Sequence, residues 1–379
     1  MAALVTVLVL AASTIGGPDE DAFLGLEPRI EGLQEAATDY DRYLSPLGDV
    51  RAVMLFARFP DSTGDETPEE LFELLVPGAV EYFERTSYGR LSLRVTPVPR
   101  WIEMDAESGS GDYDCSRFET HRRYIGEVVR KCDPDVDFSP YDVVYVVAAP
   151  SPGLPNSPTL QALPGDGIEA DGVELLHGVT FGNDIRNDHW GWRVLVHEMG
   201  HVFGLPDLYG YAPASVHEYV GGWDPMGLLT NGSHFLAWHK AKLGWIDEDQ
   251  VMVLEDDESA EVLVTPIGTS GGTKLVVLPI ADDQAYALEV RTRDTEESDE
   301  PGVLLYRVST SVASGRGPIQ VIPARGDDDD PELRRLYARH YNALYTEGTV
   351  LDDADHRVHV SIGEATPDGY LIAVTRPAE

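Results

Sequence analysis

Residues 194–209 read VLVHEMGHVFGLPDLY, and they are the most informative segment of the sequence. Its apolar residues recur as one face of a helix, at Leu195, Val196, Met199, Val202 and Phe203. His197 and His201 are four positions apart, so both imidazoles project from the same side of that helix. Neutral imidazole is a favoured ligand of Zn²⁺, and this spacing lets two rings reach one ion. The stretch therefore predicts a helix that carries half of a metal site.

Glu198 lies next to His197 and can take a proton from a water molecule that the ion activates. HExxH on a helix therefore supplies two of the metal ligands and a general base for hydrolysis. Gly204 and Pro206 end the helix, because glycine tolerates positive φ and proline cannot continue a helix. Asp207 follows six residues after the second histidine, where a longer form of the motif has its third ligand. Three protein ligands would leave a fourth position for water, as catalysis requires.

A glycine-rich turn, GGWDPMG, follows at 221–227. A sharp turn that places a methionine under the metal is the Met-turn of the metzincin group. Met226 is the predicted residue, because a thioether fills irregular space well. The alternative is an ordinary glycine corner in which Met226 belongs to the core.

Charge narrows the class of protein. The chain has 379 residues and a formal net charge of −38, from 66 Asp and Glu against 28 Lys and Arg. Its 42% of hydrophobic residues is enough for a core, which argues against global disorder. Such a negative field repels phosphate backbones and anionic membranes, so we expect no nucleic-acid partner. High-salt adaptation and a GC-rich genome both produce this composition.

The first 17 residues predict a signal peptide, because 2–12 form a short apolar run followed by small residues. A buried N-terminal strand is the alternative, since no Lys or Arg precedes the run. Export predicts a secreted protein in which Cys115 and Cys132 form one disulfide; two unrelated thiols are the alternative. No later stretch is apolar enough to span a bilayer, so we expect no stable membrane insertion.

Periodicity outlines the remaining elements. Strands are expected at 51–58, 91–95, 141–149 and 173–181, and helices at 116–131, with Ser116 as its N-cap, and 233–243. Pro77 and Gly78 are expected to split 68–85 into two helices, and 150–167 reads as a surface loop. Short alternating runs follow at 261–265, 274–280, 285–291, 302–308, 356–362 and 370–375.

The pattern as a whole predicts an α+β fold. We expect an N-terminal segment over 18–48, either a short pro-region or a helix, and a catalytic domain with a mixed sheet over 49–248. A smaller β-rich C-terminal module is expected over 249–379.

Several segments together resemble the M6 metallopeptidases, the immune-inhibitor-A group. They are HEMGHVFGLPDLYG at 197–210, the turn at 221–227, SHFLAWHKAKLGWI at 233–246, YFERTSYGRLSL at 82–93, DFSPYDVVYVV at 137–147, AYALEVR at 285–291 and GVLLYRV at 302–308. The match covers most of residues 50–310. The resemblance implies a secreted zinc endopeptidase with a zincin-like catalytic domain, one catalytic Zn²⁺, and a protein or peptide substrate. It makes His197, His201 and Asp207 the metal ligands and Glu198 the base.

Alternatives remain at several of these positions. Other residues close enough in sequence to take the third ligand position are His217, Glu218 and Asp224. Calcium is a second, structural cofactor suggested by the alternating carboxylates of Asp133, Asp135 and Asp137; a solvated acidic loop is the other interpretation. The tyrosines that could stabilise an oxyanion are Tyr209, Tyr211 and Tyr219.

The competing functions come from different classes. One is a catalytically silent binding protein with the zincin fold, and the other is a metallo-hydrolase that acts on a non-peptide bond. An intact HExxH argues against the first, because a silent protein has no need of the glutamate. We expect a monomer.

Overall fold

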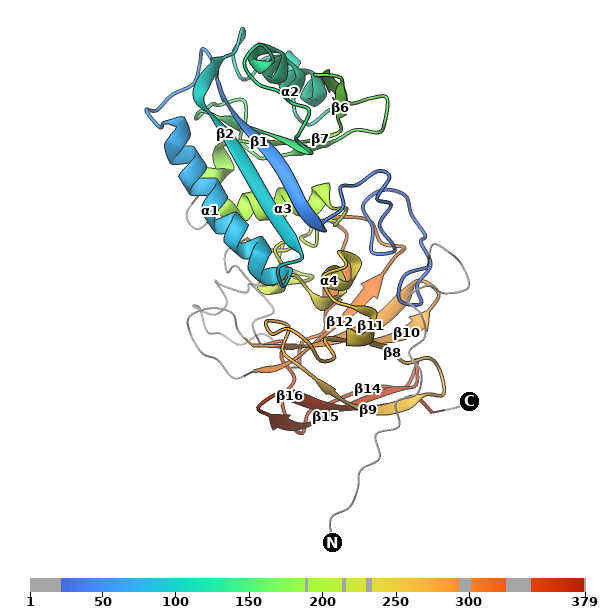
Figure 1. The fold of residues 1–379 in the computed structure, drawn as a ribbon. Helices are drawn as coiled ribbons and strands as arrows, with labels where there is room; N and C mark the ends of the chain where they lie inside the picture. Colours follow the sequence, from blue (N-terminus) through green and yellow to red (C-terminus); the bar gives the residue numbers. More distant parts are fainter. Residues whose placement is uncertain are drawn as a thin grey trace.

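The computed structural model describes residues 22–187, 190–212, 216–229, 234–292, 301–324 and 342–377. These residues form an α+β fold with two five-stranded sheets, one four-stranded sheet and a small hairpin (Figure 1). The predicted signal peptide lies outside the described residues. Within the described ranges, no helix has the length and apolarity needed to cross a membrane.

The first sheet has the strand order β2-β1-β3-β7-β4. Its strands are β1 (Gly48–Arg58), β2 (Leu91–Glu103), β3 (Val143–Ala148), β4 (Thr159–Gln161) and β7 (His177–Phe181). The neighbours among β2, β1, β3 and β7 pair in parallel, and β4 pairs antiparallel to β7 at the edge. The loop predicted over 150–167 is therefore wrong at β4, which lies beside the site described below.

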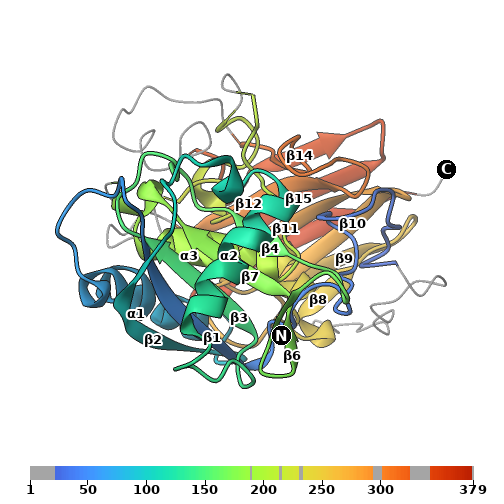
Figure 2. The same ribbon diagram turned by 90° about the horizontal axis from the view of Figure 1, so that it is seen from above.

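Helices cover both faces of this sheet (Figure 2). They are α1 (Pro68–Thr86) and α3 (Trp192–Val202) on one face and α2 (Phe118–Cys132) on the other. Successive side chains of a strand point to opposite faces. Accordingly, Met54 and Phe56 join the core under α1 and α3, whereas Val53 and Leu55 join the core under α2. Burial on both faces explains why β3 is apolar along its whole length.

Helix α1 runs without a break through Pro77 and Gly78, so the predicted split into two helices is wrong. Thr67 and Glu70 form a capping box at its start, which satisfies backbone donors there. A Cβ on Gly78 would lie 2.5 Å from the ring of Trp192, at the start of α3. The glycine therefore lets the two helices pack closely, and this packing outweighs the poor helix propensity of the pair.

After Val251 the chain forms two sheets. Their orders are β13-β12-β11-β10-β8 and β14-β15-β16-β9. The strands are β8 (Val251–Val253), β9 (Ser259–Val264), β10 (Leu275–Ala281), β11 (Gln284–Arg291), β12 (Gly302–Ser309), β13 (Ile319–Val321), β14 (Val350–Asp353), β15 (Val358–Thr366) and β16 (Gly369–Thr375). A hydrophobic core that includes Leu288 and Ile372 lies between them.

The opposite face of the five-stranded sheet belongs to another core. Ala287 and Tyr306 of that face lie in the same hydrophobic cluster as Met54 and the residues of α3. One continuous core thus crosses the predicted boundary at 248/249, and short helix α4 (Ala237–Lys242) is buried in it (Figure 1). That the β-rich region is a separate module stays a prediction. One face of its five-stranded sheet shares a hydrophobic core with the preceding residues.

The described residues 22–47, here called the N-terminal segment, are integral to this core. Leu24, Leu26 and Glu35 are buried, and the ring of Phe23 packs edge-on against Trp238 of α4 at 5.2 Å. The segment forms no helix. A pro-region that detaches without cost would not bury its side chains in this way.

The predicted disulfide is wrong, because Cys115 and Cys132 are both free. Cys132 is the last residue of α2, and Cys115 lies before Phe118, the first residue of that helix. A helix of 15 residues is about 22 Å long, whereas bridged Cα atoms lie within about 7 Å. The predicted N-cap is also one residue off, since Arg117 rather than Ser116 holds that position.

Thiol titration tests this correction. Unfolded without reductant, the protein should react with two equivalents of a disulfide reagent such as DTNB. In the folded protein both should react slowly, because burial raises the pKa of Cys115 to about 12 and that of Cys132 to about 11. If the unfolded protein had no reactive thiols, the two cysteines would form a disulfide and this correction would be wrong.

Candidate functional site

Helix α3 carries the HExxH residues in the interior of the molecule. His197 and Glu198 are 7% and 6% exposed. The helix begins after Gly191, whose φ is +42°, and the chain turns away at Gly204, whose φ is +92°. A Cβ on Gly204 would lie 2.8 Å from Thr38 of the N-terminal segment, so only glycine suits both the turn and this contact.

Three side chains meet beside this helix. The Nε2 atoms of His197 and His201 are each 3.2 Å from Oδ1 of Asp207. The ligand atoms of the three residues lie within 4.8 Å of one another, and among the described residues no other group of three could hold a metal ion. The other candidates for third ligand, His217, Glu218 and Asp224, are not part of this group.

Hydrogen bonds prepare the three atoms for a cation. Nδ1 of His197 lies 2.9 Å from the carbonyl of Pro225, and Nδ1 of His201 lies 2.9 Å from that of Leu205. Since a carbonyl only accepts, each Nδ1 carries a proton, and in the neutral form of each ring the Nε2 lone pair faces Asp207. Oδ1 of Asp207 is buried and has no hydrogen-bond partner. Two imidazoles and one carboxylate that converge in this way fit Zn²⁺.

The same geometry shifts the pKa of each group. Burial disfavours protonated His201, but the charge of Asp207 outweighs it and raises the pKa to about 9. Burial would raise the pKa of Asp207, yet His201 and His197 hold it far below its usual range. Protons and a metal ion therefore compete for one set of lone pairs. Burial also raises the pKa of Glu198, and the two histidines oppose that rise.

Glu198 is oriented by the edge strand β4. Oγ1 of Thr159 donates to Oε2 of Glu198 at 2.7 Å. In the same strand, the side-chain amide of Gln161 donates to the carbonyl of His201. The sequence offers no signal for these contacts, because Thr159 lies in a stretch rich in proline and glycine.

The turn at 221–227 lies against α3. A Cβ on Gly200 would lie 2.4 Å from Sδ of Met226, so the thioether packs on the helix between the two histidines. Pro225 of the same turn accepts the hydrogen bond from His197, and the carbonyl of Met226 accepts one from Leu208 at 2.9 Å. The turn thus contacts both the helix and the Asp207 loop.

Asp224 holds this turn from within the core. Its Oδ1 accepts from the backbone of Met226 at 2.8 Å, and its Oδ2 lies 2.9 Å from Nδ1 of His239 on α4. Nε2 of His239 is 3.3 Å from Oε1 of Glu35, a residue of the N-terminal segment. All three side chains are fully buried. Their charges therefore tie the N-terminal segment to the turn under the site.

Strand β11 braces the same turn from the other side. Nη2 of Arg291 donates to the carbonyl of Trp223 at 2.7 Å, and Nε of Arg291 pairs with Glu289 at 2.5 Å. Glu289 also accepts from the backbone of Ala237 at the start of α4. Breaking such a buried ion pair costs about 3–5 kcal/mol.

The three tyrosines named as oxyanion candidates differ in position. The hydroxyl of Tyr211 donates to Oδ2 of Asp207 at 2.7 Å. The ring of Tyr209 lies 6.0 Å from that of His197. Tyr219 instead packs against Gly317, in the loop after β12. Tyr211 therefore contacts Asp207, and Tyr209 is the tyrosine whose ring lies near the imidazole of His197.

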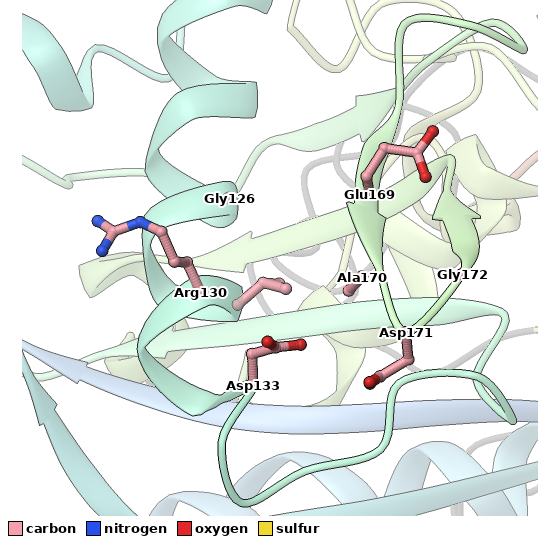
Figure 3. A pocket seen from close by; sticks show the side chains of 8 residues that line it. Gly126, Arg130, Asp133, Glu169, Ala170, Asp171 and Gly172 are labelled. Carbon is pink, nitrogen blue, oxygen red and sulfur yellow. The ribbon is translucent and has the colours of Figure 1, made fainter.

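A separate open pocket of about 440 Å³ lies between α2 and the hairpin of β5 (Ile168–Ala170) and β6 (Val173–Leu175). Figure 3 shows Arg130 and Asp133 on the α2 side of it, opposite Glu169 and Asp171. It contains none of the HExxH residues. Of the carboxylates suggested for calcium, Asp135 pairs with Arg100 at 2.8 Å and Asp137 caps Ser139, so the calcium site stays a prediction.

The buried His239 predicts a pH effect on stability. Burial opposes its charge, but Asp224 and Glu35 raise its pKa to about 10. Its stabilising contribution is therefore complete below its ordinary pKa near 6.5 and is lost as pH rises through about 10. The difference in free energy of unfolding between the wild type and His239→Gln should shrink over that range in denaturant titrations. The comparison with the variant largely cancels the opposite trend of Lys242, whose pKa burial lowers to about 8; a difference that does not change with pH would contradict the assignment.

Comparisons with known proteins return no match, either to a protein-family model or to a curated protein.

Proposed function

We propose that this protein is a secreted, zinc-dependent endopeptidase with a zincin-like catalytic domain. One observation carries the proposal. Two imidazole nitrogens and an unpartnered carboxylate oxygen converge in the interior, next to the buried carboxyl of Glu198. The resemblance to M6 metallopeptidases in the same residues agrees with it.

The residues have separate roles in this proposal. His197, His201 and Asp207 hold the ion, which when bound supplies Lewis-acid activation of water and of the scissile carbonyl. Glu198 takes a proton from the attacking water and passes it to the leaving nitrogen. Its raised pKa suits a carboxyl that must both accept and release a proton. The hydrogen bond from Thr159 orients the carboxylate of Glu198 for this proton transfer.

Strand β4 favours a peptide as substrate. Among the described strands it pairs with β7 alone, so its other edge would offer backbone donors and acceptors to an extended chain. Thr159 on this strand contacts Glu198. A peptide added to β4 would therefore run beside the general base, which favours peptide hydrolysis over a non-peptide bond.

Replacement of Glu198 by Gln tests the base. The variant should keep zinc, because Glu198 is not among the three ligands, and should lose activity on casein by at least about 10²-fold. Zinc content by mass spectrometry and casein cleavage are the two measurements. Glu73→Gln, on the exposed side of α1, makes the same change of charge away from the site and should leave both unchanged. Full activity of Glu198→Gln would contradict the mechanism.

Removal of the metal tests the cofactor. Treatment with a chelator should abolish cleavage of casein, and stoichiometric Zn²⁺ should restore it. Zinc bound at one equivalent without cleavage of any protein substrate would favour the silent binding protein or the non-peptide hydrolase.

A further inference from the structure

We propose that Ser314, in the loop between β12 and β13 (residues 310–318), belongs to the metal site and positions Asp207. The inference rests on the proposed function, because it concerns the third ligand of that site. It assigns a role in the metal site to a residue of the β-rich region that is 107 positions after Asp207 in the sequence.

The hydroxyl of Ser314 contacts both the backbone and the side chain of Asp207. Oγ of Ser314 accepts from the backbone N–H of Asp207 at 2.9 Å and donates toward Oδ2 of Asp207 at 3.4 Å. Oγ is also 3.1 Å from the hydroxyl of Tyr211, which itself donates to Oδ2. Ser314 and Tyr211 therefore both lie on the Oδ2 side of the carboxylate.

This arrangement decides which oxygen faces the histidines. A carboxylate can turn either oxygen toward a cation, and rotation about its bonds makes the two equivalent in solution. With Oδ2 held by Ser314 and Tyr211, Oδ1 is presented to His197 and His201 without a competing donor. Outer partners of this kind set the orientation of a ligand before the metal arrives.

The backbone of the loop fixes Ser314 in place. Gly315 donates to the carbonyl of Asp207 at 3.0 Å, and its own carbonyl accepts from Tyr211 at 3.1 Å. Gly315 has φ +71°, and a Cβ there would lie 2.4 Å from the ring of Tyr211. The loop thus runs against the Asp207–Tyr211 segment with no room for a side chain at this position.

The loop is anchored to the five-stranded sheet at both ends. Ser309 at its start donates to the carbonyl of Pro318 at its end at 2.8 Å, and β12 pairs with β13 directly beyond. Val321 of β13 donates to the carbonyl of Tyr219 at 2.8 Å. The strands β12 and β13 therefore hold the loop between them in place beside Asp207.

Zinc affinity of Ser314→Ala tests the inference directly. The variant leaves the backbone N–H of Asp207 without its acceptor and frees Oδ2 on one side. We expect zinc, measured by competition with a chromophoric chelator, to bind about 10–100-fold more weakly. Ser314→Thr keeps the hydroxyl and should recover most of the affinity. Ser311→Ala makes the same change on the exposed part of the loop, where the hydroxyl contacts Ser309, and should bind zinc as the wild type does.

Further readouts separate positioning from a general loss of structure. The melting temperature of metal-free Ser314→Ala should stay close to that of metal-free Ser311→Ala, while their zinc affinities differ. At saturating zinc, cleavage by Ser314→Ala should return toward the wild-type kcat. Equal zinc affinity in both variants would overturn the role of Ser314 and leave the proposed protease standing. A wild type that binds no zinc would overturn the proposed function and the positioning role with it.

Discussion

A carboxylate and two imidazoles meet beside the hydrophobic core that contains Met199 and Met226, and the neighbouring structure depends on keeping them there. Buried polar groups are costly unless each atom has a partner. Every atom of the group that does not face the centre has one: a backbone carbonyl for each Nδ1, and Tyr211 and Ser314 for Oδ2 of Asp207. The atoms that remain are the three that face one another. Burial of these three atoms without further partners costs free energy, and a cation bound between them would offset that cost.

The supports for this group come from distant parts of the described chain. The N-terminal segment contributes Glu35, which pairs with His239 and through it holds Asp224 in the turn under the histidines. Strand β4 contributes Thr159, and strand β11 contributes Arg291. These partners are up to 256 residues apart in sequence, as numbered from Glu35 to Arg291. One core, which includes residues from Phe23 to Ala343, is the physical reason that the site cannot be assigned to one segment.

The sequence predicts best what is encoded locally. The spacing of His197 and His201 on an apolar helix, and the turn after Gly204, predict two ligands, a helix end and the place of Asp207. The alternating runs after Val251 likewise predict strands that the structure contains. Partners such as Thr159, Ser314 and Glu35 have no local signal, because their roles arise only when distant strands and loops pack together. The error in α1 has the same cause, because packing of Gly78 on Trp192 overrides a local break. The disulfide error has a different cause: the number of cysteines says nothing about the helix α2 that separates them.

Crystallography of the zinc-loaded protein, with anomalous data collected on both sides of the zinc absorption edge, would locate the ion. We expect one strong anomalous peak, ligated by Nε2 of His197, Nε2 of His201 and Oδ1 of Asp207, with Glu198 beside it and not bound. A peak at another group, or a zinc ion held by the histidines with Asp207 turned away, would contradict this expectation.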